Sequence, residues 1–163
     1  MDRRRQEGLT TVEFTIVAFA LLWTMFGVID LSRVYYTVAI LDDATRRGAR
    51  VAAVCPVDDP AIKRIAVFNL SGGTLSPLVN GLDASDILVE YLDADGAAVP
   101  LPATTGFEII EFVRVSIIGG AGGFELETLV PGLSFIIGTP PMMTTMPRES
   151  LGIPRDGVAA QPC

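Results

Sequence analysis

The 163-residue chain contains no histidine. This absence excludes Ser-His-Asp triads, Cys-His pairs and histidine-ligated metal sites, because those chemistries depend on an imidazole that titrates near neutral pH. Charged residues are also few, at 19% of the chain, whereas about 25% is usual in globular proteins. The formal net charge of -7 argues against DNA or RNA as a partner.

Apolar residues make up 50% of the chain and include one long run near its N-terminus. Residues 14–29 carry no charge, and 15 of the 21 residues from Leu9 to Ile29 are apolar, with Glu13 as the only charged one. A helix of this length spans about 31 Å, which matches the hydrocarbon thickness of a bilayer. The sequence therefore predicts a transmembrane helix over residues 9–29.

Basic residues directly before this helix predict its orientation. Arg3, Arg4 and Arg5 precede the apolar run, and such clusters keep the adjoining end in the cytoplasm. Residues 28–33 lack the small residues that a signal peptidase requires, so the segment should stay attached. We expect a single-pass protein of the inner (cytoplasmic) membrane, with a cytoplasmic N-terminus and the remainder in the periplasm or outside the cell.

The helix is predicted to start at Leu9 and to continue beyond the membrane to Val54, because Pro56 disfavours helical geometry at the residue before it. An apolar stripe follows one face of the continuation. We expect helices of neighbouring subunits to associate along this face from Leu9 to Ala52. In the continuation the stripe comprises Val34, Val38, Leu41, Thr45, Gly48 and Ala52.

Beyond the helix the sequence predicts a small head. Asp58 or Asp59 can cap a short helix that starts near Pro60 and ends at about Phe68. Alternating apolar residues predict strands at 87–92 and 112–117. A last strand at 142–146 is limited by flanking prolines to an edge or a short position. The expected fold class is α+β: a long N-terminal helix followed by a small antiparallel-sheet head.

No metal site and no other cofactor are expected. The stretch Asp93-Ala94-Asp95-Gly96 resembles the start of a calcium loop, but Thr104 stands where that loop needs a glutamate. We expect a hairpin turn at Asp95-Gly96 that leads into a strand over residues 97–101.

Residues 8–14, GLTTVEF, resemble the processing site of type IV prepilins and pseudopilins. In those proteins a prepilin peptidase cuts after a glycine, and a glutamate is the fifth residue of the mature chain. The resemblance implies a cut between Gly8 and Leu9, with Leu9 as the new N-terminus and a candidate for N-methylation. Glycine lets the backbone extend into a protease, and the helix stays behind as the anchor.

Glu13 has two readings. A carboxylate costs about 2.5 to 3.5 kcal/mol at the bilayer centre and usually marks function, but at the headgroup level its cost is small. The resemblance implies that Glu13, followed by Phe14 where tyrosine is also common, acts in assembly by neutralising the N-terminal amine of a neighbouring subunit.

Residues 8–54 are similar to the TadE family of tight-adherence (Tad) pilus proteins, which are minor pilins or pseudopilins. The similarity rests on Gly8 and Glu13, the FGVID sequence at 26–30, the tyrosine pair at 35–36 and ATRRGARVAA at 44–53. It implies assembly of an adhesive pilus, with the inner membrane, a prepilin peptidase and other pilins and minor pilins as partners. It implies no enzymatic activity and no small-molecule substrate. The alternative is a signal-anchored extracytoplasmic binding or scaffold domain that does not enter a filament.

Cys55 and Cys163 are both expected beyond the membrane, where thiols oxidise. They can pair and close a loop that contributes up to about 4.7 kcal/mol in the chain-entropy model. A free Cys163 or a bond to another chain is equally open, since the C-terminal residues read as a loose tail. The expected organisation is a leader at 1–8, a transmembrane helix at 9–29, its continuation at 30–55, a head at 56–151 and a flexible tail at 152–163.

Charge is distributed unevenly. Nine acidic residues lie between Ile65 and Pro147, against Arg114 as the single basic residue. This acidic surface is expected either to keep the head soluble or to contact a basic surface of a neighbouring pilin. Arg46, Arg47 and Arg50 are the candidate basic contacts.

Overall fold

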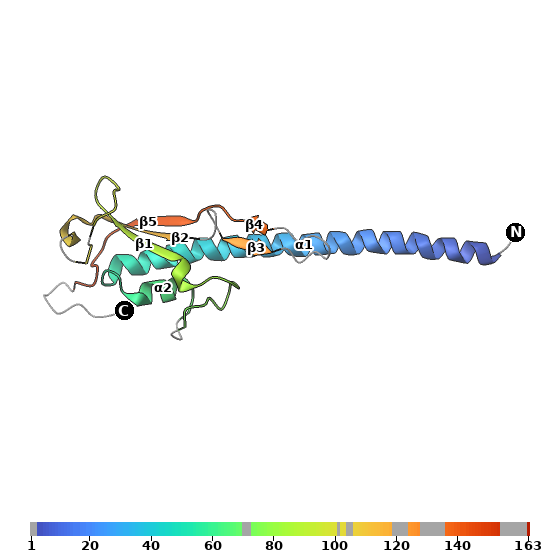
Figure 1. Cartoon of the computed structure of the whole chain (residues 1–163), viewed down its shortest axis with the longest axis horizontal. Helices are drawn as coiled ribbons and strands as arrows, with labels where there is room; N and C mark the ends of the chain where they lie inside the picture. The colour runs from blue at the N-terminus through green and yellow to red at the C-terminus, as the bar shows by residue number, and fades with distance from the viewer. Residues whose placement is uncertain are drawn as a thin grey trace. The chain divides into compact units, whose positions relative to one another are not determined.

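The computed structural model describes residues 3–69, 73–100, 102–103, 106–118, 124–127, 136–153 and 163 (Figure 1). The chain divides into two compact units: an N-terminal unit of residues 1–36 and 126–137, and a head unit of residues 37–125 and 138–163. Helix α1 (Arg3–Val54) belongs to both units, and its side chains are described from Thr10 onward.

Helix α1 contains 52 residues and begins six residues before the predicted start at Leu9, so that prediction is wrong at the N-terminal end. The arginine, glutamine and glutamate side chains of residues 3–7 favour a helix. Gly8 in the helix interior costs only about 0.5–1 kcal/mol relative to alanine, and this cost does not end the helix. The observed end at Val54 agrees with the prediction from Pro56.

Helix α2 (Pro60–Ala66) follows the turn after α1. Asp59 is its N-cap, and its carboxylate accepts a hydrogen bond from the amide of Ala61 at 2.8 Å, which confirms the predicted cap. The helix ends before the predicted Phe68, because that residue takes a left-handed conformation with φ of 64°.

The main sheet of the head is antiparallel and has the order β1-β2-β5. β1 (Ile87–Leu92) and β2 (Phe112–Ile117) have the predicted bounds, and β5 (Met143–Pro147) lies at an edge, as predicted, one residue later in the chain. A second, two-stranded sheet of β3 (Glu125–Glu127) and β4 (Ile136–Gly138) was not predicted from the sequence. Two short 3-10 helices, η1 (Ala84–Asp86) and η2 (Phe107–Ile109), precede β1 and β2.

The turn at Asp95-Gly96 is present, but the strand predicted after it is not. The amide of Gly96 donates to the carbonyl of Asp93 at 3.1 Å, as expected of a tight turn. Beyond the turn only one bridge, between Leu92 and Ala98, and a hydrogen bond from the amide of Val99 join this segment to β1. Pro100 has no amide hydrogen, so it cannot continue the ladder. Residue 101, the end of the predicted strand, lies outside the described residues.

The core of the head unit lies between the sheet and the last turns of α1 (Figure 1). β2 buries Val113, Val115 and Ile117, the alternate residues that face this core. A Cβ atom at Gly48 of α1 would lie 3.1 Å from Ala66 Cβ of α2 and 3.1 Å from Val115 Cγ1. The missing side chain at Gly48 therefore allows α1 to approach α2 and β2 closely.

The buried side of α1 corrects one prediction about assembly. Leu41, Thr45, Gly48 and Ala52 of the apolar stripe are fully or nearly fully buried inside the head unit. The hydroxyl of Thr45 also shares a hydrogen bond of 2.9 Å with that of Thr144 on β5. This part of the stripe cannot associate with neighbouring helices, because it packs against the chain's own sheet.

Candidate functional site

The residues of the predicted processing and assembly site all lie on the first turns of α1. Gly8 and Leu9 have helical backbone. Glu13 and Phe14 are exposed, Phe14 to 73%. Leu9 and Glu13 are four residues apart, so they occupy the same side of the helix one turn from each other. Among the described residues Glu13 makes no hydrogen bond or ion pair.

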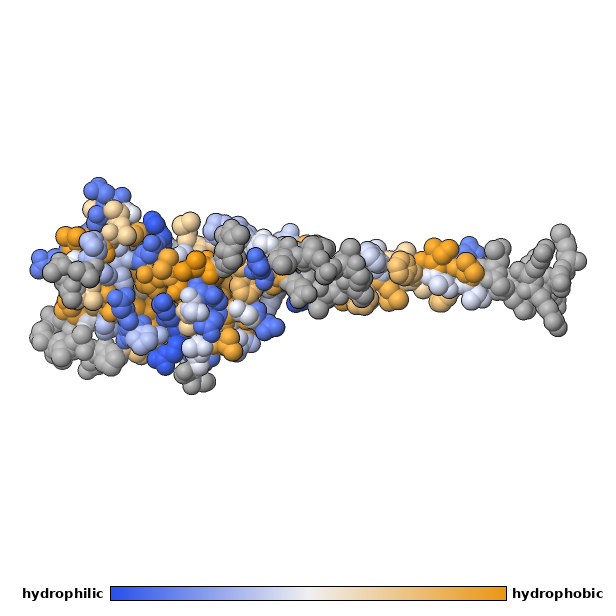
Figure 2. Space-filling view, in the orientation of Figure 1, coloured by the Kyte–Doolittle hydropathy of each residue, from blue (hydrophilic) through white to orange (hydrophobic). Residues whose placement is uncertain are grey.

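The helix around this site is apolar and exposed on all sides. Side chains that point in different directions around the helix are each more than 60% exposed: Phe14, Ile16, Val17 and Phe19. Figure 2 shows apolar side chains on the described first half of α1 in one view. A helix that is hydrophobic around its circumference requires lipid or partner helices around it.

Three hydroxyl groups within this segment are satisfied by the helix itself. The hydroxyl of Thr15 donates to the carbonyl of Thr11 at 2.8 Å, and that of Thr24 donates to Leu21 at 2.8 Å. Ser32 makes the same kind of bond to Val28 at 2.8 Å. In lipid, where water is absent, such internal bonds remove the cost of a bare hydroxyl.

An ion pair and two aromatic residues follow the apolar run. Asp30 and Arg33 are joined across 3.3 Å. Tyr35 and Tyr36 come directly after them and are 70% and 53% exposed. Charges flanked by tyrosines are typical of the level at which a helix leaves the hydrocarbon core. Among the described residues there is one helix, counted from Thr10 to Val54, that is long and apolar enough to cross a membrane.

The other end of α1 is held by a segment distant in the sequence, residues 149–152, which we call the C-terminal clamp. The carbonyls of the last helical turn have no partners within the helix. The amides of Glu149 and Leu151 donate to the carbonyl of Ala53 at 3.0 and 3.3 Å. Val54 accepts from the amide of Gly152 at 2.6 Å and from the hydroxyl of Ser150 at 3.1 Å. The clamp thereby satisfies the helix end.

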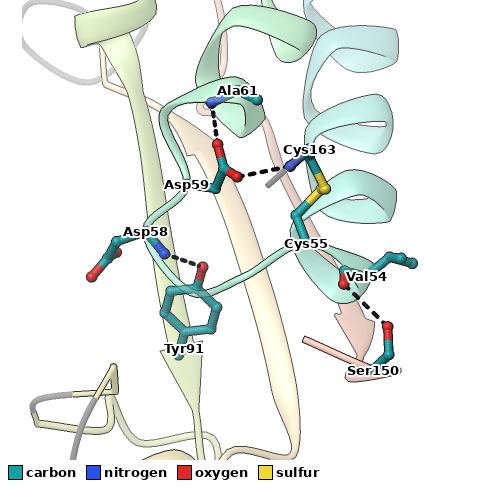
Figure 3. The surroundings of a disulfide bond; sticks show 8 residues. All are labelled: Val54, Cys55, Asp58, Asp59, Ala61, Tyr91, Ser150 and Cys163. Atoms are coloured by element: carbon teal, nitrogen blue, oxygen red, sulfur yellow. Dashed lines mark hydrogen bonds between the residues drawn. A yellow bond between two sulfur atoms is a disulfide. The ribbon is translucent and has the colours of Figure 1, made fainter. Parts of the chain in front are cut away.

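A disulfide joins Cys55 and Cys163 immediately beyond the clamped helix end (Figure 3). The Cα atoms of the two residues are 5.8 Å apart and the residues are separated by 108 positions in the sequence. The amide of Cys163 also donates to the second carboxylate oxygen of Asp59 at 3.0 Å. Asp59 therefore caps α2 with one oxygen and holds Cys163 with the other.

Beside the disulfide, Tyr91 of β1 holds the turn between the two helices (Figure 3). The amide of Asp58, which has a left-handed φ of 62°, donates to the hydroxyl oxygen of Tyr91 at 3.1 Å. Burial raises the pKa of Tyr91, and the hydrogen bond from Asp58 opposes that shift in part.

Sequence reasoning named the residues of the N-terminal motif, whose roles stay predictions, and offered the pairing of Cys55 with Cys163 as one of its alternatives. It missed the C-terminal clamp. The expected flexible tail begins at Gly152, yet Gly152 bonds to α1 and Cys163 is fixed by its disulfide. Residues 154–162 of that tail lie outside the described residues. The clamp acts through backbone amides, so side-chain patterns carry no signal for it except the glycine at its end.

Together, an exposed apolar helix that continues into a small antiparallel α+β head defines a pilin-like protein. Residues 8–50 match the family model described as TadE-like protein, so this part of the chain is similar to that family. The matched segment starts at Gly8, includes Glu13, and supports a role related to the Tad pilus. Neither the curated proteins nor the solved structures that were compared contain a match.

Proposed function

We propose that this chain is a minor pilin or pseudopilin of a Tad-type adhesive pilus, processed after Gly8 by a prepilin peptidase. The observation that carries the proposal is the TadE-like match, which starts at Gly8 on a helix whose apolar side chains are exposed all round. Removal of residues 1–8 leaves the whole apolar run on the mature chain. The anchor therefore survives processing, unlike that of a secreted protein.

The organisation along the chain follows from this proposal. Residues 1–8 are a cytoplasmic leader, 9–29 span the inner membrane, 30–55 continue the helix and 56–151 form a head in the periplasm or in the pilus. Arg3 to Arg5 support the cytoplasmic position of the leader. Tyr35 and Tyr36 support the position of the opposite membrane surface.

Processing creates a positive charge one helical turn from the negative charge of Glu13. The new amine at Leu9 is positive and Glu13 is negative, and each is costly to place in lipid without a partner. When subunits pack side by side, Glu13 of one subunit neutralises the Leu9 amine of its neighbour and fixes the axial register between them. Phe14, at 73% exposure, is available to pack between the same two helices.

Substitutions at the two sites test the proposal through pilus formation. We expect Gly8→Leu to abolish processing and pili, because leucine restricts the backbone that glycine leaves free. Gly27→Leu is the matched control, because a Cβ atom at Gly27 meets nothing within 4 Å. Glu13→Gln should be processed normally and yet form no pili. Normal pili with either Gly8→Leu or Glu13→Gln would contradict the proposal and favour an anchored domain outside the filament.

A further inference from the structure

Three arginines on α1 line a groove on the head unit. Arg46, Arg47 and Arg50 lie on consecutive turns of the helix, and Ile65 of α2 contributes to the opposite side. The volume of the groove is about 450 Å³. We call it the arginine groove, and its lining comprises Asp43, Arg46, Arg47, Arg50, Val51 and Ile65.

The groove carries an excess of positive charge. Arg47 pairs with Asp43 at 3.3 Å, and Arg46 pairs with Asp42 at 3.0 Å. These side chains are 46–62% exposed, and exposed pairs of this kind are weak and yield readily to a stronger partner. Arg50 has no hydrogen bond or ion pair among the residues that the structure describes. A carboxylate entering the groove would therefore find a guanidinium available.

Phe68, which lies outside the groove lining, contacts one of the groove's arginines and has an unfavourable backbone conformation. Its φ of 64° is one that bulky residues rarely adopt. In that conformation the ring lies 4.5 Å from the guanidinium carbon of Arg47, in a cation–π contact. This conformation ends α2, and it leaves the ring in contact with an arginine of the groove.

The same head carries a surface of opposite charge, which we call the acidic end. It comprises the exposed or half-exposed Asp93, Asp95, Glu108 and Glu111. The amide of Glu111 donates to the carbonyl of Leu92 at 2.8 Å, which places it beside the turn that begins at Asp93. Arg148, the adjacent basic residue, uses its guanidinium to donate to the carbonyls of Phe107 and Glu108 at 3.3 and 3.5 Å. Among the described residues this guanidinium forms no ion pair with the carboxylates of the acidic end, and the carboxylates outnumber it.

We propose that the arginine groove binds the acidic end of a second copy of this chain. The charges are complementary, and arginine forks suit carboxylates. Because the groove and the acidic end are different surfaces, each copy keeps one of each free after pairing, so the contact can repeat from copy to copy. The contact goes beyond the proposed function, and it requires neither processing after Gly8 nor pairing by Glu13.

Pull-down between two differently tagged, unprocessed full-length copies in detergent micelles tests the contact. Arg50→Glu in both copies should lower retention of the second copy by about tenfold, a size typical of losing a close charge pair, because neither copy then offers an intact groove to the acidic end of the other. Lys63→Glu is the matched control, since it makes the same charge change at an exposed residue of α2 outside the groove lining. Association through the apolar helices is common to all variants and cancels in the comparison.

Charge reversal on the other side should restore the contact. With Arg50→Glu in both copies, a further Glu111→Arg in both should restore retention. A further Glu125→Arg in both, at an exposed residue outside the acidic end, should not restore it. The proposal would be overturned if Arg50→Glu and the unmodified chain gave equal retention, or if Lys63→Glu caused the same loss as Arg50→Glu. It would also be overturned if Glu111→Arg did not restore retention. An Arg50→Glu effect confined to binding of phosphatidylglycerol vesicles would overturn it too, because the groove would then serve a lipid phosphate. Failure here would leave the N-terminal processing results unchanged, so the two proposals are separable.

Discussion

The amide nitrogen of Gly152 lies 2.6 Å from the carbonyl oxygen of Val54, the last residue of α1. The same glycine has a φ of 80°, and a Cβ atom added to it would lie 2.7 Å from the backbone nitrogen of Pro56. Only glycine meets both requirements, because it tolerates this φ and leaves room for the adjacent backbone. The shortest hydrogen bond of the C-terminal clamp therefore depends on a glycine at this position.

Replacement of Gly152 by alanine should destabilise the head through this contact. We expect Gly152→Ala to lower the free energy of unfolding by about 1–3 kcal/mol more than Gly96→Ala, because forced overpacking has costs of that size. Gly96 is the matched control, since its φ of 81° is nearly the same but a Cβ there meets nothing within 4 Å. Urea unfolding of the full chain in micelles measures both, and equal losses would mean that Pro56 is not an obstacle.

The elements that the sequence predicted best are those defined by local patterns. Alternation of Ile87, Val89 and Tyr91, and of Val113 and Val115, gave the bounds of β1 and β2, because a strand with one buried face must repeat every two residues. Likewise, the position of Asp59 before Pro60 located the start of α2.

Long-range contacts explain what the sequence did not reveal. Burial of Leu41, Thr45 and Gly48 against the head was not predicted, because an apolar stripe has the same appearance whether it faces the same chain or another. The clamp and the pairing of Cys55 with Cys163 depend on segments about a hundred residues apart. The arginines at 46, 47 and 50 were identified from charge alone, but their shared groove required the position of α2.

Loss of the disulfide should destabilise the head without changing its fold. Cys163→Ser should lower the free energy of unfolding by about 2–4 kcal/mol, the usual contribution of a bond that closes a long loop. Cys55→Ser and the double variant should show nearly the same loss, since either single change already breaks the bond. Losses that add in the double variant would show that the two thiols contribute separately. Urea unfolding under non-reducing conditions distinguishes these results.

Alkaline pH should destabilise the chain through Tyr91. The pKa of Tyr91 is raised above its ordinary value by burial, so the folded state favours the protonated phenol. Its contribution to stability is full below pH of about 10, the pKa of an unfolded tyrosine, and is lost as pH rises through the folded pKa. Tyr91→Phe should abolish this part of the alkaline loss. The free energy of unfolding is measured for both proteins from about pH 8 to pH 11. A parallel decline in the two proteins would contradict the assignment of this loss to Tyr91.

Close approach of α1 to the sheet depends on Gly48. Gly48→Val should lower the free energy of unfolding by about 1–3 kcal/mol, because its methyl groups would overlap Ala66 and Val115 in the core. Ala39→Val, at an exposed position of the same helix, should cost a few tenths of a kcal/mol through helix propensity alone. Thermal unfolding of the two variants side by side makes the comparison. Equal midpoints would show that the core yields at Gly48.

The most direct test of the central claim uses the chain extracted from the membrane of cells that hold the Tad assembly machinery. Its intact mass and its N-terminal sequence are measured. The account predicts a mature chain that begins at Leu9, with or without an N-methyl group, and that keeps the apolar helix. A chain that keeps Met1 or Asp2 at its start, or one cut after Ile29 and released from the membrane, would contradict it.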